Sequence, residues 1–350
     1  MTAVLGSPQL TPSMARGKGV WAAAAMRFRT DHVGMASLVI VAIFLLVVLA
    51  SGLGLVARDW QAERGVPDAP PTFLGPAAKT ESVAVAAPSG PNVDISAVDP
   101  LAPRYAEWAE AAKKYQTQIV VKADTLPFGG DRLGRDVLAK AIKGAQVSIL
   151  VGVSAAVLAT LIGTLLGAVA GFFGGKAGDL LEWVYNVFTA IPSILLIFAF
   201  AAVFGRGIGS VVLILGLAGW TGIYRLVRAE FIKHAVRDYV RSAEAIGASN
   251  ASRMFRHILP NVSHVVLVQL SIHVVGFIKS EVILSYLGLG VGVDQVSWGT
   301  MLSEAQSELI LGHWWQLAAA TIFMAVFVTA FSLMTDALRD ALDPKLRGLE

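Results

Sequence analysis

The stretch Asp238–Asn261, DYVRSAEAIGASNASRMFRHILPN, decides how the chain is organised, because it is polar and lies between two long apolar runs. Its pattern predicts an amphipathic helix, a turn at Gly247, a short basic helix and a stop at Leu259-Pro260. The first helix carries small residues that would let another surface approach its backbone, at Ser242, Ala243, Ala245 and Ala248. A basic rim is expected from Arg241, Arg253, Arg256 and His257. A simple connector needs only a few turn residues, so we interpret this stretch as a docking element.

The composition outside this stretch is that of a membrane protein. The chain has 350 residues, of which 55% are hydrophobic and 15% charged, and its mean hydropathy is +0.64. Several apolar runs reach about 20 residues, enough to cross a hydrocarbon core of roughly 30 Å as a helix. The sequence therefore predicts an all-α polytopic membrane protein. The absence of cysteine excludes disulfides, thiolate metal sites and thiol nucleophiles. A net charge of +3 gives no reason to expect a nucleic-acid partner.

Six spans are expected, with both termini in the cytoplasm. The expected order is a cytoplasmic segment (1–34), a first span (35–57), an extracytoplasmic proline-rich loop with an amphipathic helix (58–146), a core holding spans 2–6 and the loop 238–261 (147–335), and a cytoplasmic tail (336–350). Within the core, the spans are placed at about 147–173, 181–204, 210–224, 262–282 and 314–334. The first apolar run exceeds the 7–15 residues typical of a signal peptide, which favours a retained signal-anchor.

The basic residues set the orientation of these spans. Seven fall between 225 and 256, namely Arg225, Arg228, Lys233, Arg237, Arg241, Arg253 and Arg256, and none falls between 280 and 337. Cytoplasmic loops carry the excess of Lys and Arg. We therefore expect 238–261 to face the cytoplasm and 58–130 to face outward.

The outward loop holds nine of the 14 prolines and should be largely irregular. A short helix is expected at 103–115 and a short strand at 118–122. The loop is either a solvated spacer or a docking surface for an external protein. The segment 131–147 reads as an amphipathic helix along the outer membrane surface, with Lys140 and Lys143 off its apolar face.

Small and polar residues mark further positions inside the spans. Span 2 carries a small-residue stripe at four-residue spacing, formed by Ala155, Ala159, Gly163, Gly167 and Gly171, which predicts a close helix–helix contact. Pro192 should kink span 3. Gln269 and His273 lie within span 5, either in an interhelical hydrogen bond or on a translocation path. Lys279 and Glu281, near its outer end, are expected to snorkel to the surface.

The loop 238–261 resembles the cytoplasmic loop of ABC importer permeases, whose usual form is E-A-A, three residues, G, nine residues, I-x-L-P. Arg241-Ser242-Ala243 occupy the first positions, Gly247 the glycine, His257 the isoleucine, and Leu259-Pro260 the end. The acidic first position is replaced by Arg241, which removes any ionic pairing made through it. The ending His257–Asn261 is the form of the branch that imports oligopeptides, dipeptides and nickel. Three further stretches of this chain resemble that branch: Gly134-Arg135-Asp136, Glu281–Gly290 with Trp298-Gly299, and Asp336 with Leu338–Pro344.

The resemblance implies a type I permease fold and a subunit that does no chemistry itself. It implies a homologous second permease, two ATP-binding subunits that use ATP and Mg, an extracytoplasmic substrate-binding protein, and a place in a bacterial inner membrane. The chain itself would hold no cofactor, metal or catalytic residue. The contact with the ATP-binding subunits is assigned to Arg241, Ser242, Ala243, Gly247, Ala248, Arg256, His257, Leu259 and Pro260.

Peptides are the substrates expected from the branch, with nickel or another small solute as the alternative. An ion-coupled secondary transporter would carry several acidic residues inside its spans and often an inverted repeat, and the sequence lacks both signs. An intramembrane enzyme would need paired groups, whereas His264 and His273 have no acidic partner at ligand spacing.

Overall fold

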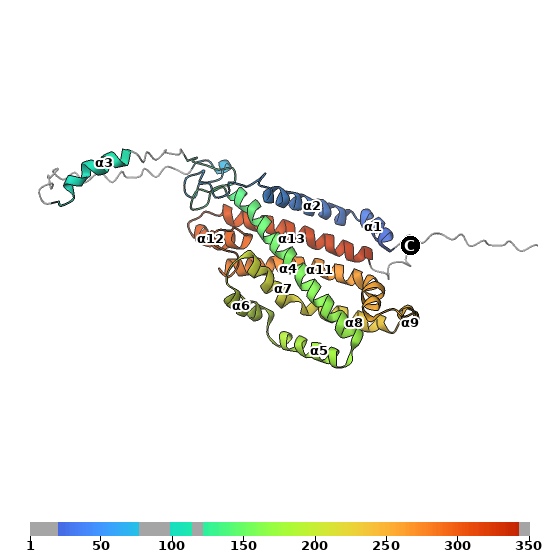
Figure 1. Cartoon of the computed structure of the whole chain (residues 1–350). Helices are drawn as coiled ribbons and strands as arrows, with labels where there is room; N and C mark the ends of the chain where they lie inside the picture. Colours follow the sequence, from blue (N-terminus) through green and yellow to red (C-terminus); the bar gives the residue numbers. More distant parts are fainter. Residues whose placement is uncertain (1–19, 77–98, 114–121, 343–350) are drawn as a thin grey trace, which may run out of the picture.

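The computed structural model describes residues 20–76, 99–113 and 122–342, and most of its helices pack into one bundle (Figure 1). The helices are α1 (Val20–Thr30), α2 (His32–Gly52), α3 (Tyr105–Lys113), α4 (Val137–Phe173), α5 (Gly175–Ala190), α6 (Ser193–Phe204), α7 (Ile208–Gly219), α8 (Thr221–Ala235), α9 (Asp238–Ala245), α10 (Asn250–Ser252), α11 (Leu259–Tyr286), α12 (Trp298–Ile310) and α13 (Trp315–Leu342). Short 3₁₀ turns lie at Thr72–Leu74 and Ala102–Arg104, and a π-helical turn lies at Arg253–Ile258. Only isolated β-bridges occur within the described ranges.

The prediction of an all-α polytopic membrane protein is confirmed. Four helices are long and apolar enough to cross a membrane: α2, α4, the continuous helix Asn250–Tyr286, and α13. Two further pairs qualify if each is taken as one bent span, α5 with α6 at 91° and α7 with α8 at 43°. The described part of the chain therefore holds up to six spans, two of them broken.

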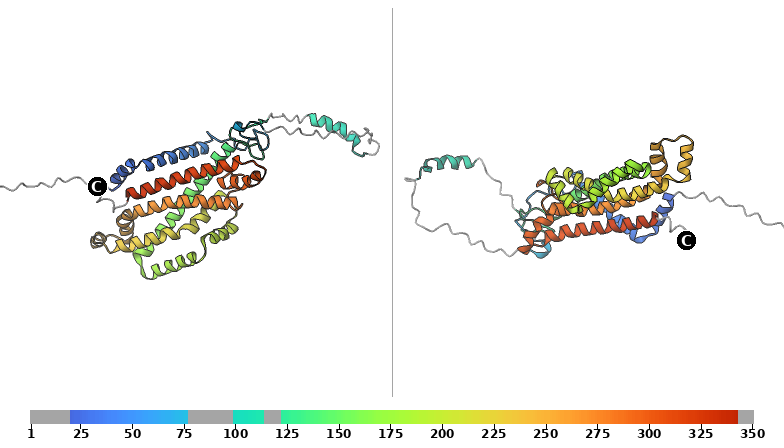
Figure 2. Two further views of the ribbon diagram at one scale, coloured as in Figure 1. Left: turned by 180° about the vertical axis from the view of Figure 1, so that it is seen from behind. Right: turned by 90° about the horizontal axis from the view of Figure 1, so that it is seen from below.

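Helix α4 is the centre of the packing. It contacts α2, α5, α7, α8, α11, α12 and α13. At one end of the bundle lie α9, the start of α2 and the end of α13, and at the other lie α6 and α12 (Figures 1 and 2). The end that holds α9 is the one predicted to face the cytoplasm.

The start of α4 differs from the prediction. The segment 131–147 is no separate helix on the membrane surface, because α4 begins at Val137 and runs without a break to Phe173. The Asp136 side chain caps it by accepting from the amides of Leu138 and Ala139. Lys140 is fully buried rather than placed at a surface. The prediction failed because carboxylates distant in sequence compensate the buried ammonium group.

Pro192 was predicted to kink span 3, but the structure shows a complete break between α5 and α6 at this residue. Proline has no amide hydrogen and disfavours helical geometry in the residue before it. Ile191 accordingly has ψ of 130°, and the helix restarts at Ser193 after a 91° turn.

Leu259-Pro260 is not the helix stop that the sequence suggested. The helix continues from the π-helical turn into α11, and the Leu259 amide donates to Met254 O across that wider turn. Pro260 is the second residue of α11 and directly follows the wider π-helical turn.

Backbone hydrogen bonds join the two ends of the loop predicted to face outward. The Gly65 amide donates to Gly134 O at 2.8 Å, and the Asp68 amide donates to Asp131 O at 2.9 Å. These bonds bring residues 63–72 alongside residues 123–136. A helix does form at Tyr105–Lys113, within the expected 103–115. The expected strand at 118–122 lies almost wholly outside the described residues.

Candidate functional site

The segment Asp238–Asn261 projects from the bundle at the end where α13 finishes (Figures 1 and 2). Helix α9 ends at a glycine turn, where Gly247 has φ of 87° and its amide donates to Glu244 O. A residue with a Cβ rarely adopts this left-handed conformation, so glycine fixes the direction in which the chain leaves α9. The Ser249 side chain then accepts from the Ser252 amide and starts the next helix.

The projecting segment is anchored to the bundle by apolar packing and a cation–π contact, and an ion pair joins its two helices. Val240, Met254 and Ile258 are buried in one cluster with Val227 and Phe231 of α8. Arg253 pairs with Glu244 at 2.6 Å, and its guanidinium lies 5.3 Å from the ring centre of Phe172. The second helix is therefore held against α9 and α4.

The assigned coupling residues differ in accessibility. The exposed ones are Arg241, Ser242, Gly247, Arg256 and Pro260, and the half-buried ones are Ala248, His257 and Leu259. Ala243 is only 3% exposed because its side chain faces this chain, which corrects the expectation that it faces a partner.

Two apolar residues at this protrusion were missed by sequence reasoning. Ile246 is 85% exposed and Phe255 is 46% exposed, and both are large side chains offered to solvent. Apolar side chains that stand free at a helix end favour contact with another protein. The available signal was an isoleucine immediately before the helix-ending glycine.

The glycines of α4 form a close seam with α8. A Cβ at Gly163 would lie 2.5 Å from Trp220 O, one at Gly167 would lie 2.7 Å from Tyr224 O, and one at Gly171 would lie 2.6 Å from Arg228 O. All three contacts are to backbone carbonyls, which cannot rotate away. Because α8 leads directly into the protrusion, this seam fixes the protrusion relative to α4.

Gln269 and His273 are brought together on α11. Their Nε2 atoms are 3.4 Å apart, and the His273 ring stacks on Phe277 with centroids 5.2 Å apart. Gln269 also lines a cavity of about 310 Å³ together with Leu226, His264 and Arg339. The structure thus places both residues on one side of α11, near a hollow between α8, α11 and α13.

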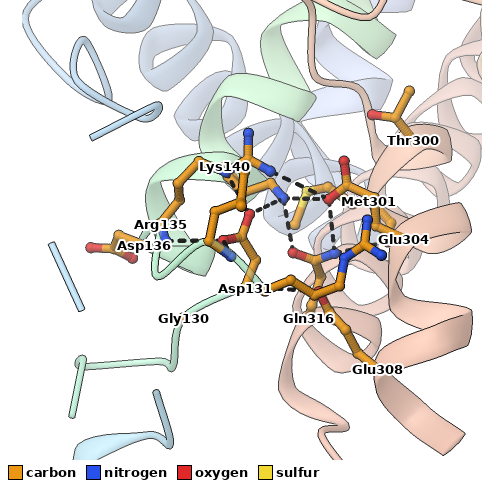
Figure 3. A network of polar contacts seen from close by, with 12 residues as sticks. Gly130, Asp131, Arg135, Asp136, Lys140, Thr300, Met301, Glu304, Glu308 and Gln316 are labelled. Atoms are coloured by element: carbon orange, nitrogen blue, oxygen red, sulfur yellow. Dashed lines mark hydrogen bonds and ion pairs between the residues drawn. The ribbon is translucent and has the colours of Figure 1, made fainter. Parts of the chain in front are cut away.

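A buried polar network lies at the opposite end of the bundle (Figure 3). The Lys140 ammonium group is its centre and donates to Asp131 Oδ2 at 2.7 Å, Glu304 Oε2 at 2.6 Å and Gln316 Oε1 at 3.0 Å. These three acceptors satisfy all three of its N–H bonds. The network joins α4 to the preceding loop, α12 and α13.

Asp131 is the innermost carboxylate of this network and is fully buried. Burial by itself would raise the pKa of the Asp131 carboxyl, but the nearby Lys140 and Arg135 and a backbone hydrogen bond hold it below its usual value. Asp131 therefore stays ionised, and its negative charge offsets the positive charge of Lys140.

Glu281 lies on α11 and was predicted to snorkel to the surface. This prediction is wrong, because the side chain is fully buried. Its carboxylate accepts from Ser285 Oγ at 2.6 Å. Nearby, the Trp298 amide donates to Ser148 Oγ, which ties the start of α12 to α4. Ser285, one turn along the same helix, therefore satisfies one carboxyl oxygen of Glu281, and the other oxygen is buried without a hydrogen-bond partner among the described residues.

Glu308, on α12, should make the stability of the chain depend on pH. Burial raises the pKa of the Glu308 carboxyl from 4.5 to about 7, against the opposing effect of Lys140. The folded chain then binds a proton more tightly than the unfolded chain, so stability should fall as pH rises from about 4.5 to 7 and stay level above it. We expect the loss to be on the order of 3 kcal/mol.

Glu308→Gln should remove this loss, because a neutral amide has no proton to release. The measurement is the melting temperature of the purified chain from pH 5 to 8. The advantage of Glu308→Gln over the unsubstituted chain should grow up to pH 7, and Glu107→Gln, on exposed α3, should give none. Parallel pH curves for Glu308→Gln and the unsubstituted chain would contradict the assignment.

The described residues hold no cluster of three His, Asp or Glu side chains able to bind a metal ion. The ionisable groups around Lys140 are hydrogen-bonded or ion-paired to one another.

Comparison with known proteins agrees with this architecture. Residues 163–348 match the family described as binding-protein-dependent transport system inner membrane component. The chain is 36% identical over 238 residues to the oligopeptide transport system permease protein of Bacillus subtilis (strain 168), which covers 67% of this chain and 78% of the relative. It is 36% identical over 220 residues to the dipeptide transport system permease protein of the same strain, covering 63% and 69%.

A third relative is the glutathione transport system permease protein of Escherichia coli O6:K15:H31, 38% identical over 222 residues, covering 63% of this chain and 73% of the relative. The family match includes the glycine seam, the protrusion and α11 to α13. The resemblance first indicated by the 238–261 motif is confirmed. The chain belongs to the inner-membrane permeases of ABC importers, in the branch that contains the peptide permeases.

Proposed function

We propose that this chain is the permease subunit of an ATP-driven importer of short peptides. It forms part of the translocation path and pairs with a homologous permease. Two ATP-binding subunits drive it from the cytoplasm, and an extracytoplasmic binding protein delivers the substrate. Support for the substrate comes from the relatives, which are named for dipeptide, oligopeptide and glutathione transport.

The observation that carries the proposal is the rigid protrusion with an unpartnered apolar tip. Ile246 stands 85% exposed beside Gly247, while Val240, Met254 and Ile258 hold the protrusion to α8. The described residues have no arrangement suited to ATP hydrolysis, so energy must arrive by contact. A preformed helical tip is suited to receive that contact and to move α8 with it.

Two substitutions test the contact with the ATP-binding subunits. Ile246→Asp places a charge where an apolar side chain would be buried against the partner, and should abolish recovery of the ATP-binding subunits in a pull-down. Gly247→Val forces a β-branched residue into φ of 87°, costing roughly 1 kcal/mol or more and redirecting the second helix. A Cβ at Gly247 meets no atom within 4 Å, so the chain itself should still fold.

Arg241→Gln is the matched control, since Arg241 is exposed on the same helix and stands at the position of Glu in the usual form of the loop it resembles. It should keep most of the recovery. Normal recovery with both Ile246→Asp and Gly247→Val would show that the protrusion is only a connector.

A further inference from the structure

A second polar site lies at the end of the bundle away from the protrusion. Its cavity of about 240 Å³ is lined by Arg206, Ser285, Gly288, Thr300, Ser303 and Glu304, among others. It is formed by the α6–α7 turn, the end of α11 and the first turns of α12. This volume lies below the ~300–1,000 Å³ of drug-sized sites, so the cavity suits a small ligand.

Arg206 brings an available positive charge to this cavity. Its side chain is exposed, and within the described residues it forms no ion pair or hydrogen bond. Its guanidinium lies over Gly288, where a Cβ would be 3.7 Å from Nη2. The Gly207 amide donates to Gly290 O at 3.0 Å, which ties the turn that carries Arg206 to the loop that lines the cavity.

Glu304 brings a carboxylate oxygen without a hydrogen-bond partner among the described residues to the same cavity. Its Oε2 atom accepts from Lys140 and Gln316, at 2.6 and 3.2 Å, and lies 3.8 Å from Arg135 (Figure 3). Its Oε1 atom has no hydrogen-bond partner among the described residues, and the side chain is 33% exposed. The buried network therefore holds one oxygen and leaves the other free at the cavity. Ser303 adds a hydroxyl that is also unpaired within the described segments.

We propose that this cavity binds the zwitterionic backbone of a dipeptide-sized solute at the outer mouth of the permease. Glu304 Oε1 accepts from the free ammonium group, and the Arg206 guanidinium donates to the free carboxylate in the two-pronged manner that suits arginine. Glu304 needs no rearrangement, since Lys140 and Gln316 already fix it. This inference rests on the proposed function and adds a recognition step on the permease itself.

The test is binding to the full chain in nanodiscs, without ATP or partner proteins, measured by NMR saturation transfer. The probes are dialanine, N-acetyl-dialanine, dialanine amide and the doubly capped peptide. Removing either terminal charge should weaken binding by about tenfold, the usual effect of losing a charge-assisted hydrogen bond.

The Arg206→Gln and Glu304→Gln variants should each lose the ability to distinguish a charged from a capped terminus at one end of the peptide. Arg206→Gln should weaken binding of dialanine by about tenfold and leave binding of dialanine amide unchanged. Glu304→Gln should also weaken binding of dialanine by about tenfold, and it should leave binding of N-acetyl-dialanine unchanged. A purely structural effect would weaken all probes alike. Arg132→Gln removes an exposed charge that does not line the cavity and should change nothing.

Equal binding of all four probes to the unsubstituted chain would overturn the inference. So would Arg206→Gln and Glu304→Gln variants that lose affinity for every probe to the same extent. Failure of the proposed function would appear separately, as absence of ATP-driven uptake by the assembled complex. The nanodisc measurement does not involve that step, so the two failures are distinguishable.

Discussion

Lys140→Met should destabilise the chain by about 3–5 kcal/mol, the cost of removing one partner from a buried ion pair. Methionine has nearly the length of lysine but no charge. The substitution leaves the fully buried Asp131 with Arg135 as its remaining cation, at 2.6 Å, and removes a 2.6 Å bond from Glu304. It also removes the point at which α4, α12 and α13 meet. The measurement is detergent-induced unfolding of the purified chain.

Lys143→Met is the control for this prediction. Lys143 lies one turn along α4, is half-buried, and donates to Gln146 at 2.8 Å. Its loss should cost less than about 1 kcal/mol. Adding Asp131→Asn to Lys140→Met should restore part of the stability, because Asp131 and Glu304 would otherwise share Arg135 as their one cation. A Lys140→Met chain as stable as the Lys143→Met chain would contradict the role given to the network.

Gly167→Leu should prevent native packing of α4 on α8 and abolish assembly and transport. A Cβ at Gly167 would already lie 2.7 Å from Tyr224 O and 3.1 Å from the Arg228 amide nitrogen. Backbone atoms cannot move aside singly, so the helices must separate. Overpacking of this kind costs about 1–3 kcal/mol, and more where no side chain can yield. Separation would also displace α9, which follows α8 in the chain.

Leu165→Ala is the matched control on α4. Leu165 is 51% exposed, so its truncation leaves no internal cavity and should be mild. Both variants are compared by size-exclusion profile in detergent and by peptide uptake in the assembled complex. If Gly167→Leu were tolerated as well as Leu165→Ala, the α4–α8 seam would not be a close contact.

The sequence predicted features that arise from local periodicity. The apolar runs predicted a polytopic helical protein, and the small-residue stripe marked the glycines that the structure places against α8. These signals are readable because lipid demands long apolar helices and close helix contacts demand small residues. The turn at Gly247 was readable for a similar reason, since few other residues adopt its φ.

The features that sequence reasoning missed depend on partners far apart in the chain. Lys140 was assigned to a surface because its acceptors, Glu304 and Gln316, lie 164 and 176 residues away. Glu281 was expected to snorkel, yet its burial depends on residues of other segments. Ala243 was predicted to contact a partner protein, but helix periodicity does not show which face of the helix packs against the rest of the chain. Pairs of polar groups far apart in the chain produce no regular spacing of residue types in the sequence.

The central claim is that ATP-binding subunits drive peptide uptake through the protrusion Asp238–Asn261. The most direct measurement is uptake of labelled dialanine into proteoliposomes that contain the assembled complex, with the unsubstituted chain or the Gly247→Val chain. Uptake should require ATP and the ATP-binding subunits with the unsubstituted chain, and should be lost with Gly247→Val. Uptake by this chain alone under an ion gradient, or undiminished ATP-driven uptake with Gly247→Val, would contradict the claim.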